Sequence, residues 1–217
     1  MKNPHRILCF VIATANEGKL KEFRHILARL SEIHDGVKVE VVSAAELGLL
    51  DFPPEDGDSY EANALIKARY VTGSSGLIAI ADDSGLEVDA LGGAPGIYSA
   101  RYGGKGSDGE RLNYLLEQMK LYPNAPRSAR FQCAIVLNFP NGSYKSFFGT
   151  SEGSIITQAK GENGFGYDPI FLSDDLNLTF AEASQEQKKA VSHRGRAVAS
   201  LISWLQGDEI NFEAALM

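Results

Sequence analysis

The chain has little cysteine, no long apolar run and no excess of positive charge. Of its 217 residues only Cys9 and Cys133 are cysteines, and each falls inside an apolar run. That placement favours buried, reduced thiols and a cytoplasmic location. No apolar run approaches the roughly 18 residues of a membrane span, so no membrane partner is expected. With 21 basic against 28 acidic residues, the net charge of −7 argues against a nucleic-acid polymer as partner.

Histidine is scarce as well, and its spacing excludes a zinc site. The chain has 4 histidines, and none of the others stands at a metal-ligand spacing from His193. A hydrophobic content of 44% and a charged content of 23% are typical of a globular protein. The apolar N-terminal stretch runs into Asn16 without a cleavage pattern, so we expect a first strand and no signal peptide.

Strands and helices alternate in the first half of the sequence, and a hairpin follows in the second. Apolar spacing predicts strands at 7–14, 37–42 and 77–81, and hairpin strands at 130–139 and 143–150. It predicts helices from 17 to about 30 and at 59–72, 108–120 and 185–205. Glycine and proline indicate a loop at 91–107. The pattern predicts an α/β fold: a two-lobed mixed β-sheet flanked by helices, in one domain over 1–217.

Two adjacent acids follow the apolar run 77–81, in the order Ala-Asp-Asp-Ser-Gly. Ligand sites in open α/β sheets lie beyond the carboxyl ends of strands, and we expect this run to end there. Asp82 and Asp83 then stand where carboxylates hold Mg²⁺ and activate water. An Asp turn that satisfies loop N–H groups explains the same residues without catalysis.

Two further segments suit phosphate binding. Residues 14–19, Thr-Ala-Asn-Glu-Gly-Lys, join the first strand to the first helix, where free N–H groups attract phosphate oxygens. An ordinary N-cap followed by a solvated lysine is the alternative. Asn63 and Lys67 share one helix face and can offer an amide and an ammonium group, although exposed lysines are mostly just solvated. Glu55 supplies a third acid in the preceding loop, unless it is merely hydrated.

A glycine-bracketed turn suits a planar base. Residues 164–169, Gly-Phe-Gly-Tyr-Asp-Pro, offer two aromatic rings for stacking and Asp168 for a hydrogen bond, or form a turn at the edge of the core. Lys188, Ser192, His193 and Arg194 add cations and donors. Residues 104–109 match G-x-G-x-x-G, but no strand is expected before them, which excludes dinucleotide binding there.

Six short motifs occur in register along nearly the whole chain: Thr-x-Asn-x-x-Lys at 14–19, Asn-Ala-x-x-Lys-Ala at 63–68, Ala-Asp-Asp-Ser-Gly-Leu at 81–86, Gly-Gly-Ala-Pro-Gly-Ile-Tyr-Ser-Ala-Arg-Tyr at 92–102, Gly-Phe-Gly-Tyr-Asp-Pro at 164–169 and Ser-His-Arg at 192–194. Together they resemble the inosine/xanthosine triphosphate pyrophosphatase family, in its bacterial branch. The resemblance implies a Mg²⁺-dependent homodimer that hydrolyses ITP, dITP and XTP to the monophosphate and pyrophosphate. It also implies an active-site cleft between the two lobes.

The resemblance also implies residue roles. Asp83 is the expected general base for the water that attacks the α-phosphorus, and Glu55 and Asp83 are the expected Mg²⁺ contacts; Asp82 is left open as a third. The triphosphate of the substrate is expected to contact Thr14, Ala15, Asn16, Glu17, Gly18, Lys19 and Lys67. Ser84 is expected to lie beside the substrate. The residues expected around the base are Phe165, Gly166, Tyr167, Asp168, Lys188, His193 and Arg194.

Three readings of the function remain at this point. A pyrophosphatase for non-standard purines would aim donors of His193 and Arg194 at the 6-oxo group of the base. A related enzyme would remove pyrophosphate from pyrimidine or methylated nucleotides. A nucleotide-binding sensor would not turn over, but binding alone does not require a base beside the metal.

Overall fold

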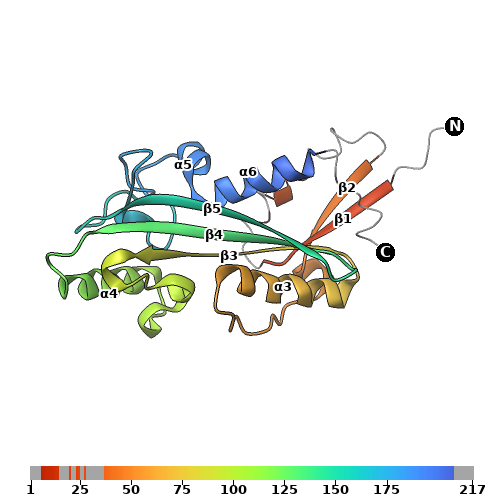
Figure 1. Ribbon diagram of the computed structural model, residues 1–217, viewed down its shortest axis with the longest axis horizontal. Helices are drawn as coiled ribbons and strands as arrows, with labels where there is room; N and C mark the ends of the chain where they lie inside the picture. Colours follow the sequence, from red (N-terminus) through yellow and green to blue (C-terminus); the bar gives the residue numbers. More distant parts are fainter. Residues whose placement is uncertain (1–5, 15–19, 21–22, 25–26, 28–36, 208–217) are drawn as a thin grey trace. The chain divides into compact units, whose positions relative to one another are not determined.

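The computed structural model describes residues 6–14, 20, 23–24, 27 and 37–207. Its strands form a six-stranded mixed sheet in the order β2-β1-β3-β4-β5-β6 (Figure 1). β1 (Arg6–Ile12) lies parallel to β2 (Val37–Ser43) and to β3 (Ile78–Val88). β5 (Tyr144–Ile155) lies antiparallel to β6 (Phe171–Ser173). The predicted mixed-sheet α/β fold is confirmed.

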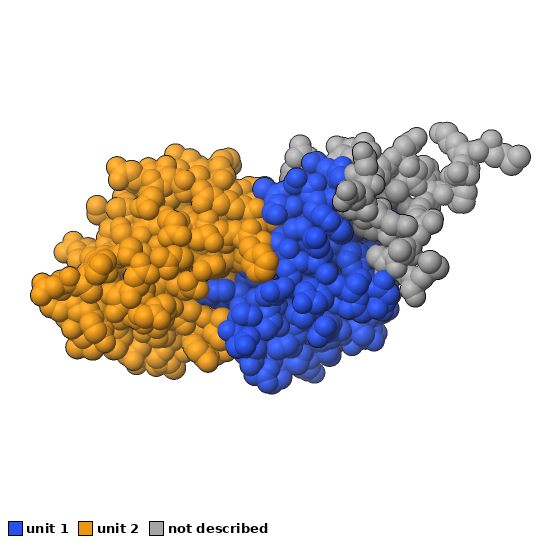
Figure 2. All heavy atoms as spheres, viewed as in Figure 1, with its two compact units in different colours: residues 1–83, 134–147, 198–217 blue, residues 84–133, 148–197 orange. Residues whose placement is uncertain are grey.

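Two compact units divide the chain (Figure 2). Unit 1 comprises residues 1–83, 134–147 and 198–217, and unit 2 comprises residues 84–133 and 148–197. The strands β3, β4 (Ser128–Asn138) and β5 contribute residues to both units. In β3 the boundary falls between Asp83 and Ser84, so two consecutive candidate residues belong to different units.

The core of unit 1 forms where α3 (Tyr60–Ser75) packs on the sheet. Ser59 caps the helix by accepting a hydrogen bond from the N–H of Ala62 at 3.1 Å. Ala64, Ala68 and Val71 are fully buried and form one cluster with sheet residues that include Val11, Ala79 and Val136. Small residues on this face of the helix let it approach the strands closely.

The core of unit 2 forms around α4 (Asp108–Lys120), whose bounds match the predicted 108–120. Ser107 and Glu110 make a reciprocal capping box at its start. Leu112, Leu115 and Met119 follow at helical spacing and pack with strand residues such as Leu86 and Phe131. The predicted period therefore corresponds to the buried face.

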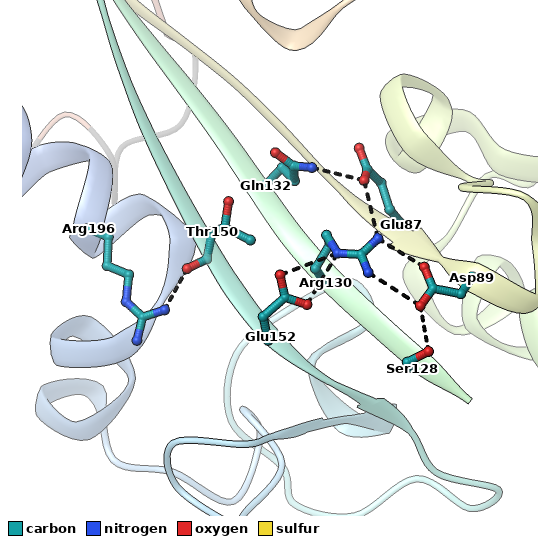
Figure 3. Close-up of polar contacts among 8 residues, drawn as sticks. All are labelled: Glu87, Asp89, Ser128, Arg130, Gln132, Thr150, Glu152 and Arg196. Carbon is teal, nitrogen blue, oxygen red and sulfur yellow. Dashed lines mark hydrogen bonds and ion pairs between the residues drawn. The ribbon is translucent and has the colours of Figure 1, made fainter. Parts of the chain in front are cut away.

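The opposite side of β4 in unit 2 carries polar side chains (Figure 3). Arg130 donates to Asp89 at 2.9 Å and forms an ion pair with Glu152 of β5 at 3.2 Å. Gln132 donates to Glu87 of β3 at 2.9 Å. Side chains alternate between faces along a strand, so residues next to Arg130 in the sequence face the core while Arg130 stays at the surface.

Three of the predicted elements differ from the structure. The strand predicted at 143–150 is β5, which continues five residues further, to Ile155. β3 does not end at Ala81 but continues through both acids to Val88. The predicted helix 185–205 is two helices, α5 (Gln185–Val191) and α6 (His193–Leu205), because Ser192 between them is extended, with φ −69° and ψ 154°. Side-chain period alone cannot reveal a single extended residue.

The other predicted elements agree with the structure as far as it describes them. β4 and β5 form the predicted hairpin, in which the N–H of Phe139 donates to the carbonyl of Ser143 at 2.9 Å. The predicted loop at 91–107 contains a cis Ala94–Pro95 bond and short 3₁₀ turns. The 3₁₀ segments are Ala45–Leu47, Asp89–Leu91, Gly96–Gly104 and Asp168–Ile170.

The predicted first helix lies mostly outside the described residues. Of it, residues 20, 23, 24 and 27 are described as helical, and Phe23 and Leu27 are buried. None of the helices in the described part of the chain has the length and apolar character that crossing a bilayer requires.

Candidate active site

The acids of β3 lie just beyond the carboxyl end of β1. β1 ends at Ile12, and the N–H of Ala13 still donates to the carbonyl of Ile80 in β3 at 2.8 Å. Asp82 and Asp83 follow Ile80 and Ala81 within β3. The prediction that these acids stand beyond the end of their own strand is wrong, because β3 continues through them and they form no Asp turn; they lie instead next to the end of the neighbouring strand β1.

Asn63 on α3 positions the second of these acids. Its side-chain amide donates to Oδ2 of Asp83 at 3.0 Å, and its Oδ1 accepts from the N–H of Gly57 at 2.9 Å. Asn63 is fully buried, so both hydrogen bonds are shielded from water. One amide thus holds the carboxylate and also the loop that follows Glu55.

Lys67 lies one helical turn after Asn63. Its Nζ donates to the backbone carbonyl of Asp82 at 2.8 Å and forms an ion pair with Oε1 of Glu55 at 2.6 Å. The Lys67 side chain is only 14% exposed and that of Glu55 30%. Unit 1 therefore brings together Glu55, Lys67, Asp82 and Asp83, which come from one loop, one helix and one strand.

The predicted phosphate loop is described only at its first residue. Thr14 follows β1 and is half-buried. Ala15, Asn16, Glu17, Gly18 and Lys19 lie outside the described residues.

The donor set in unit 1 suits a hard divalent cation that is shared with a substrate. Glu55 and Asp83 offer carboxylate oxygens, the ligands that Mg²⁺ prefers, and Mg²⁺ typically takes one or two of these together with substrate phosphates. Across the described ranges of the chain, no three His, Cys, Asp or Glu residues are grouped as a metal cage. The residues fit Mg²⁺ bound jointly by protein and phosphates.

In unit 2 the turn 164–168 presents Phe165 to solvent. Oδ2 of Asp168 accepts a hydrogen bond from the N–H of Phe165 at 2.8 Å and forms an ion pair with Lys188. Gly164 has φ +78°, and a Cβ there would overlap the Asp168 carboxylate. The Phe165 ring is 57% exposed, and Nζ of Lys188 lies 4.9 Å from its centre. An exposed ring held in this way can stack on a planar base.

Tyr167, predicted as a second stacking ring, is buried instead. It is 4% exposed, and its hydroxyl donates to the carbonyl oxygen of Ser99 at 3.0 Å. Burial raises the pKa of the Tyr167 hydroxyl well above its usual range. Tyr167 therefore anchors the turn from beneath, and Phe165 is its exposed ring.

The break between α5 and α6 places His193 and Arg194 at the start of α6. Nη2 of Arg194 donates to Oγ of Ser84 at 3.1 Å, which joins α6 to β3. The His193 ring stacks on Phe131, with ring centres 4.8 Å apart and planes inclined by 15°. His193 is 6% exposed, so its ring is part of the core surface as well as a candidate donor.

Ser99 supports the site and was not predicted. Its Oγ accepts from the N–H of Leu86 at 2.9 Å and donates to the carbonyl of Gly96 at 2.6 Å, while its own carbonyl holds Tyr167. It stands in the motif 92–102, whose residue types suggest no chemistry. Its place in this motif is the sequence feature that could have indicated Ser99, and the fold shows which residues Ser99 contacts.

Comparisons with known proteins show which sequences and structures this chain is similar to. A dITP/XTP pyrophosphatase of Thermus thermophilus is 45% identical over 192 residues, which cover 88% of this chain and 89% of the relative. One from Vibrio vulnificus is 46% identical, with coverage of 90% and 96%. The solved structure of the Staphylococcus aureus Ham1 protein superposes with a TM-score of 0.83 at 39% identity and covers 93% of this chain and 100% of its own.

A family model provides the broader assignment. The model of the Ham1 family matches residues 10–204, which include the acids of β3, the turn 164–168 and the start of α6. The fold, the extent of this match and the near-complete coverage of bacterial relatives confirm the resemblance seen in the six motifs. The chain belongs to the Ham1 family.

Proposed function

We propose that this protein hydrolyses non-standard purine nucleoside triphosphates, namely ITP, dITP and XTP, to the monophosphate and pyrophosphate. The observation that carries the proposal is the Asp83 carboxylate held by Asn63 beside the Lys67–Glu55 ion pair. Relatives that share this fold at about 45% identity are named dITP/XTP pyrophosphatases. Enzymatic hydrolysis explains why acids and cations are grouped, whereas a binding protein needs only the cations.

Asp83 is the general base in the proposed reaction. A water between its carboxylate and the α-phosphorus gives a proton to Asp83 as its oxygen bonds to phosphorus. The bond from the α-phosphorus to the bridging oxygen then breaks, and pyrophosphate leaves. Phosphoryl transfer depends mainly on positioning and charge, and the Asn63 hydrogen bond fixes the direction of the carboxylate.

The triphosphate is held by cations and backbone groups of unit 1. Lys67 supplies a fixed ammonium group, and residues 14–19 supply backbone N–H groups and Lys19. Glu55 and Asp83 are the residues that would hold Mg²⁺ together with the phosphates, and Asp82 stays a candidate. When bound, Mg²⁺ neutralises charge that develops on the phosphate oxygens.

The base is held by the turn 164–168 and by the start of α6. Phe165 stacks on its plane, while Gly166, Tyr167, Asp168 and Lys188 set the position of that ring. Donors of His193 and Arg194 face the 6-oxo group, and Ser84 lies beside the substrate and orients Arg194. Adenine presents an amino group instead and would leave these donors unpaired.

We also propose a homodimer, as the resemblance implies, and a cytoplasmic location, consistent with two free cysteines.

Steady-state release of pyrophosphate tests the proposal. Wild type, Asp83→Asn and the exposed control Asp174→Asn are assayed with ITP, XTP, dUTP and the four common triphosphates, with and without Mg²⁺. We expect ITP and XTP to be preferred, activity to require Mg²⁺, and Asp83→Asn to lose about 10²- to 10⁴-fold in kcat. Binding of ITP without turnover would establish a sensor, and faster turnover of dUTP would establish a different pyrophosphatase.

A further inference from the structure

The carboxylate of Asp108 joins the start of α4 to the turn that carries Phe165. Its Oδ2 accepts a hydrogen bond from the N–H of Gly166 at 2.7 Å, across 58 positions of sequence. Its Oδ1 forms an ion pair with Arg111, one turn further along α4. Both groups belong to unit 2.

The helix does not need this carboxylate for its own cap. The hydroxyl oxygen of Ser107 accepts from the N–H of Glu110, and the Glu110 carboxylate accepts from the N–H of Ser107 at 3.0 Å. With the capping box complete, one oxygen of the Asp108 carboxylate binds a distant backbone group, and the other pairs with Arg111 of the same helix. Its contact with Gly166 is therefore not explained by helix formation.

Two successive N–H groups of the turn each end on a carboxylate. The N–H of Phe165 is bound by Asp168, which belongs to the turn itself and is buried. The N–H of Gly166 is bound by Asp108, which comes from another element and whose side chain is 48% exposed. Asp108 is thus an external restraint on the peptide that follows Phe165.

We propose that Asp108 is a positioning residue for nucleobase binding, which it serves by holding the peptide of Gly166 and thereby the orientation of the Phe165 ring. The inference rests on the proposed function, because it takes Phe165 as the surface on which the base stacks. It assigns a role to the segment 104–109, whose glycine pattern does not bind a dinucleotide. Ligands that contain the base depend on Asp108, whereas ligands that contain only phosphates do not.

Direct binding of IMP and of inorganic pyrophosphate tests this role in the full-length protein, by calorimetry with Mg²⁺. For Asp108→Ala we expect the Kd of IMP to rise about three- to tenfold, which is the net effect of one ordinary hydrogen bond, because the Asp108 carboxylate is half-exposed. The Kd of pyrophosphate is expected to change less than about twofold. Asp108→Asn keeps an amide oxygen that can accept from Gly166 and is expected to restore most of the affinity for IMP.

Glu117→Ala is the matched control, because Glu117 is an exposed acid of the same helix that pairs with Lys120 on the helix surface. Thermal unfolding of each variant shows whether the fold is intact. The inference is overturned if Asp108→Ala binds IMP as tightly as wild type, if IMP and pyrophosphate weaken together, or if Asp108→Asn fails to restore binding. A separate result would show that the proposed function is wrong: the wild-type protein binds IMP but releases no pyrophosphate from ITP.

Discussion

Asn63 donates a hydrogen bond from its side-chain amide to Oδ2 of Asp83 at 3.0 Å while its carbonyl oxygen holds Gly57. Asn63→Ala removes both bonds. Because the carboxylate loses its orientation, we expect kcat for ITP to fall about 10- to 100-fold. We expect the free energy of unfolding to fall by roughly 1–3 kcal/mol, because buried hydrogen bonds are lost.

Steady-state kinetics and urea unfolding measure the two effects of Asn63→Ala. Asn124→Ala, at an exposed position after α4, is the control and is expected to change neither quantity. Wild-type kcat in Asn63→Ala would show that Asp83 needs no orienting partner.

Arg194→Ala tests the source of base selectivity. Arg194 donates to Ser84 and stands next to His193 at the start of α6. Loss of one donor to the 6-oxo group is expected to lower the ratio of kcat/KM for ITP to that for ATP by about tenfold. Arg196→Ala is the control. Arg196 lies two residues after Arg194, and its substitution removes an ion pair with Asp175. Undiminished preference for ITP in Arg194→Ala would contradict the assignment.

Acid should destabilise the protein through three glutamates that accept local hydrogen bonds, Glu46, Glu110 and Glu182. Hydrogen bonds from the Ser or Thr three positions earlier lower the pKa of each below the ordinary value of 4.5. A lowered folded-state pKa gives stabilisation that is complete above that ordinary value and is lost as pH falls through the lowered pKa. We therefore expect the Tm to be nearly level from pH 7 to about 5 on account of these groups, and to fall below pH 4.5.

Glu110→Gln isolates one of these contributions. Glutamine carries no charge, so the variant lacks the charge-assisted hydrogen bonds that Glu110 accepts. Its Tm at pH 7 is expected to be lower than that of wild type, and its Tm is expected to fall less steeply in acid. Glu162→Gln, at an exposed loop position, serves as the control. An acid decline in Glu110→Gln as steep as that of wild type would show that Glu110 contributes nothing to the pH dependence.

Gly195→Ala tests the junction of α5 and α6. A Cβ at Gly195 would overlap the carbonyl oxygen of Lys189, which is backbone and cannot rotate away. We expect a loss of about 1–3 kcal/mol in the free energy of unfolding, and weaker preference for ITP because His193 and Arg194 shift with the junction.

Gly73→Ala is the matched control for Gly195→Ala. Gly73 lies in α3 with no heavy atom within 4 Å of an added Cβ. Alanine there is expected to raise the free energy of unfolding by roughly 0.5–1 kcal/mol, because it restricts the unfolded chain. Equal stability of the two variants in urea would show that the junction tolerates a side chain.

The elements that the sequence predicts well are those with complete local signals. The helix 108–120 has its capping pair and its apolar period within the same residues, and the hairpin has Asn141-Gly142 between two apolar runs. Asn63 and Lys67 were expected on one helix face because a spacing of four residues requires it in any helix. These features depend on neighbours in the sequence, so no knowledge of the fold is needed to find them.

The sequence by itself therefore determined the fold class, the helix face of Asn63 and Lys67, and, through six motifs in register, the family. Only the tertiary structure decided that β3 continues past Asp83, that Ser192 interrupts the last helix, that Tyr167 is buried on Ser99, and that Asp108 reaches Gly166. For Tyr167 and Asp108 the physical reason is that their hydrogen-bond partners, Ser99 and Gly166, lie 68 and 58 positions away in the chain. Residue types and periods specify what a segment can form, and the partners that the fold brings to it decide where it ends and which polar group it holds.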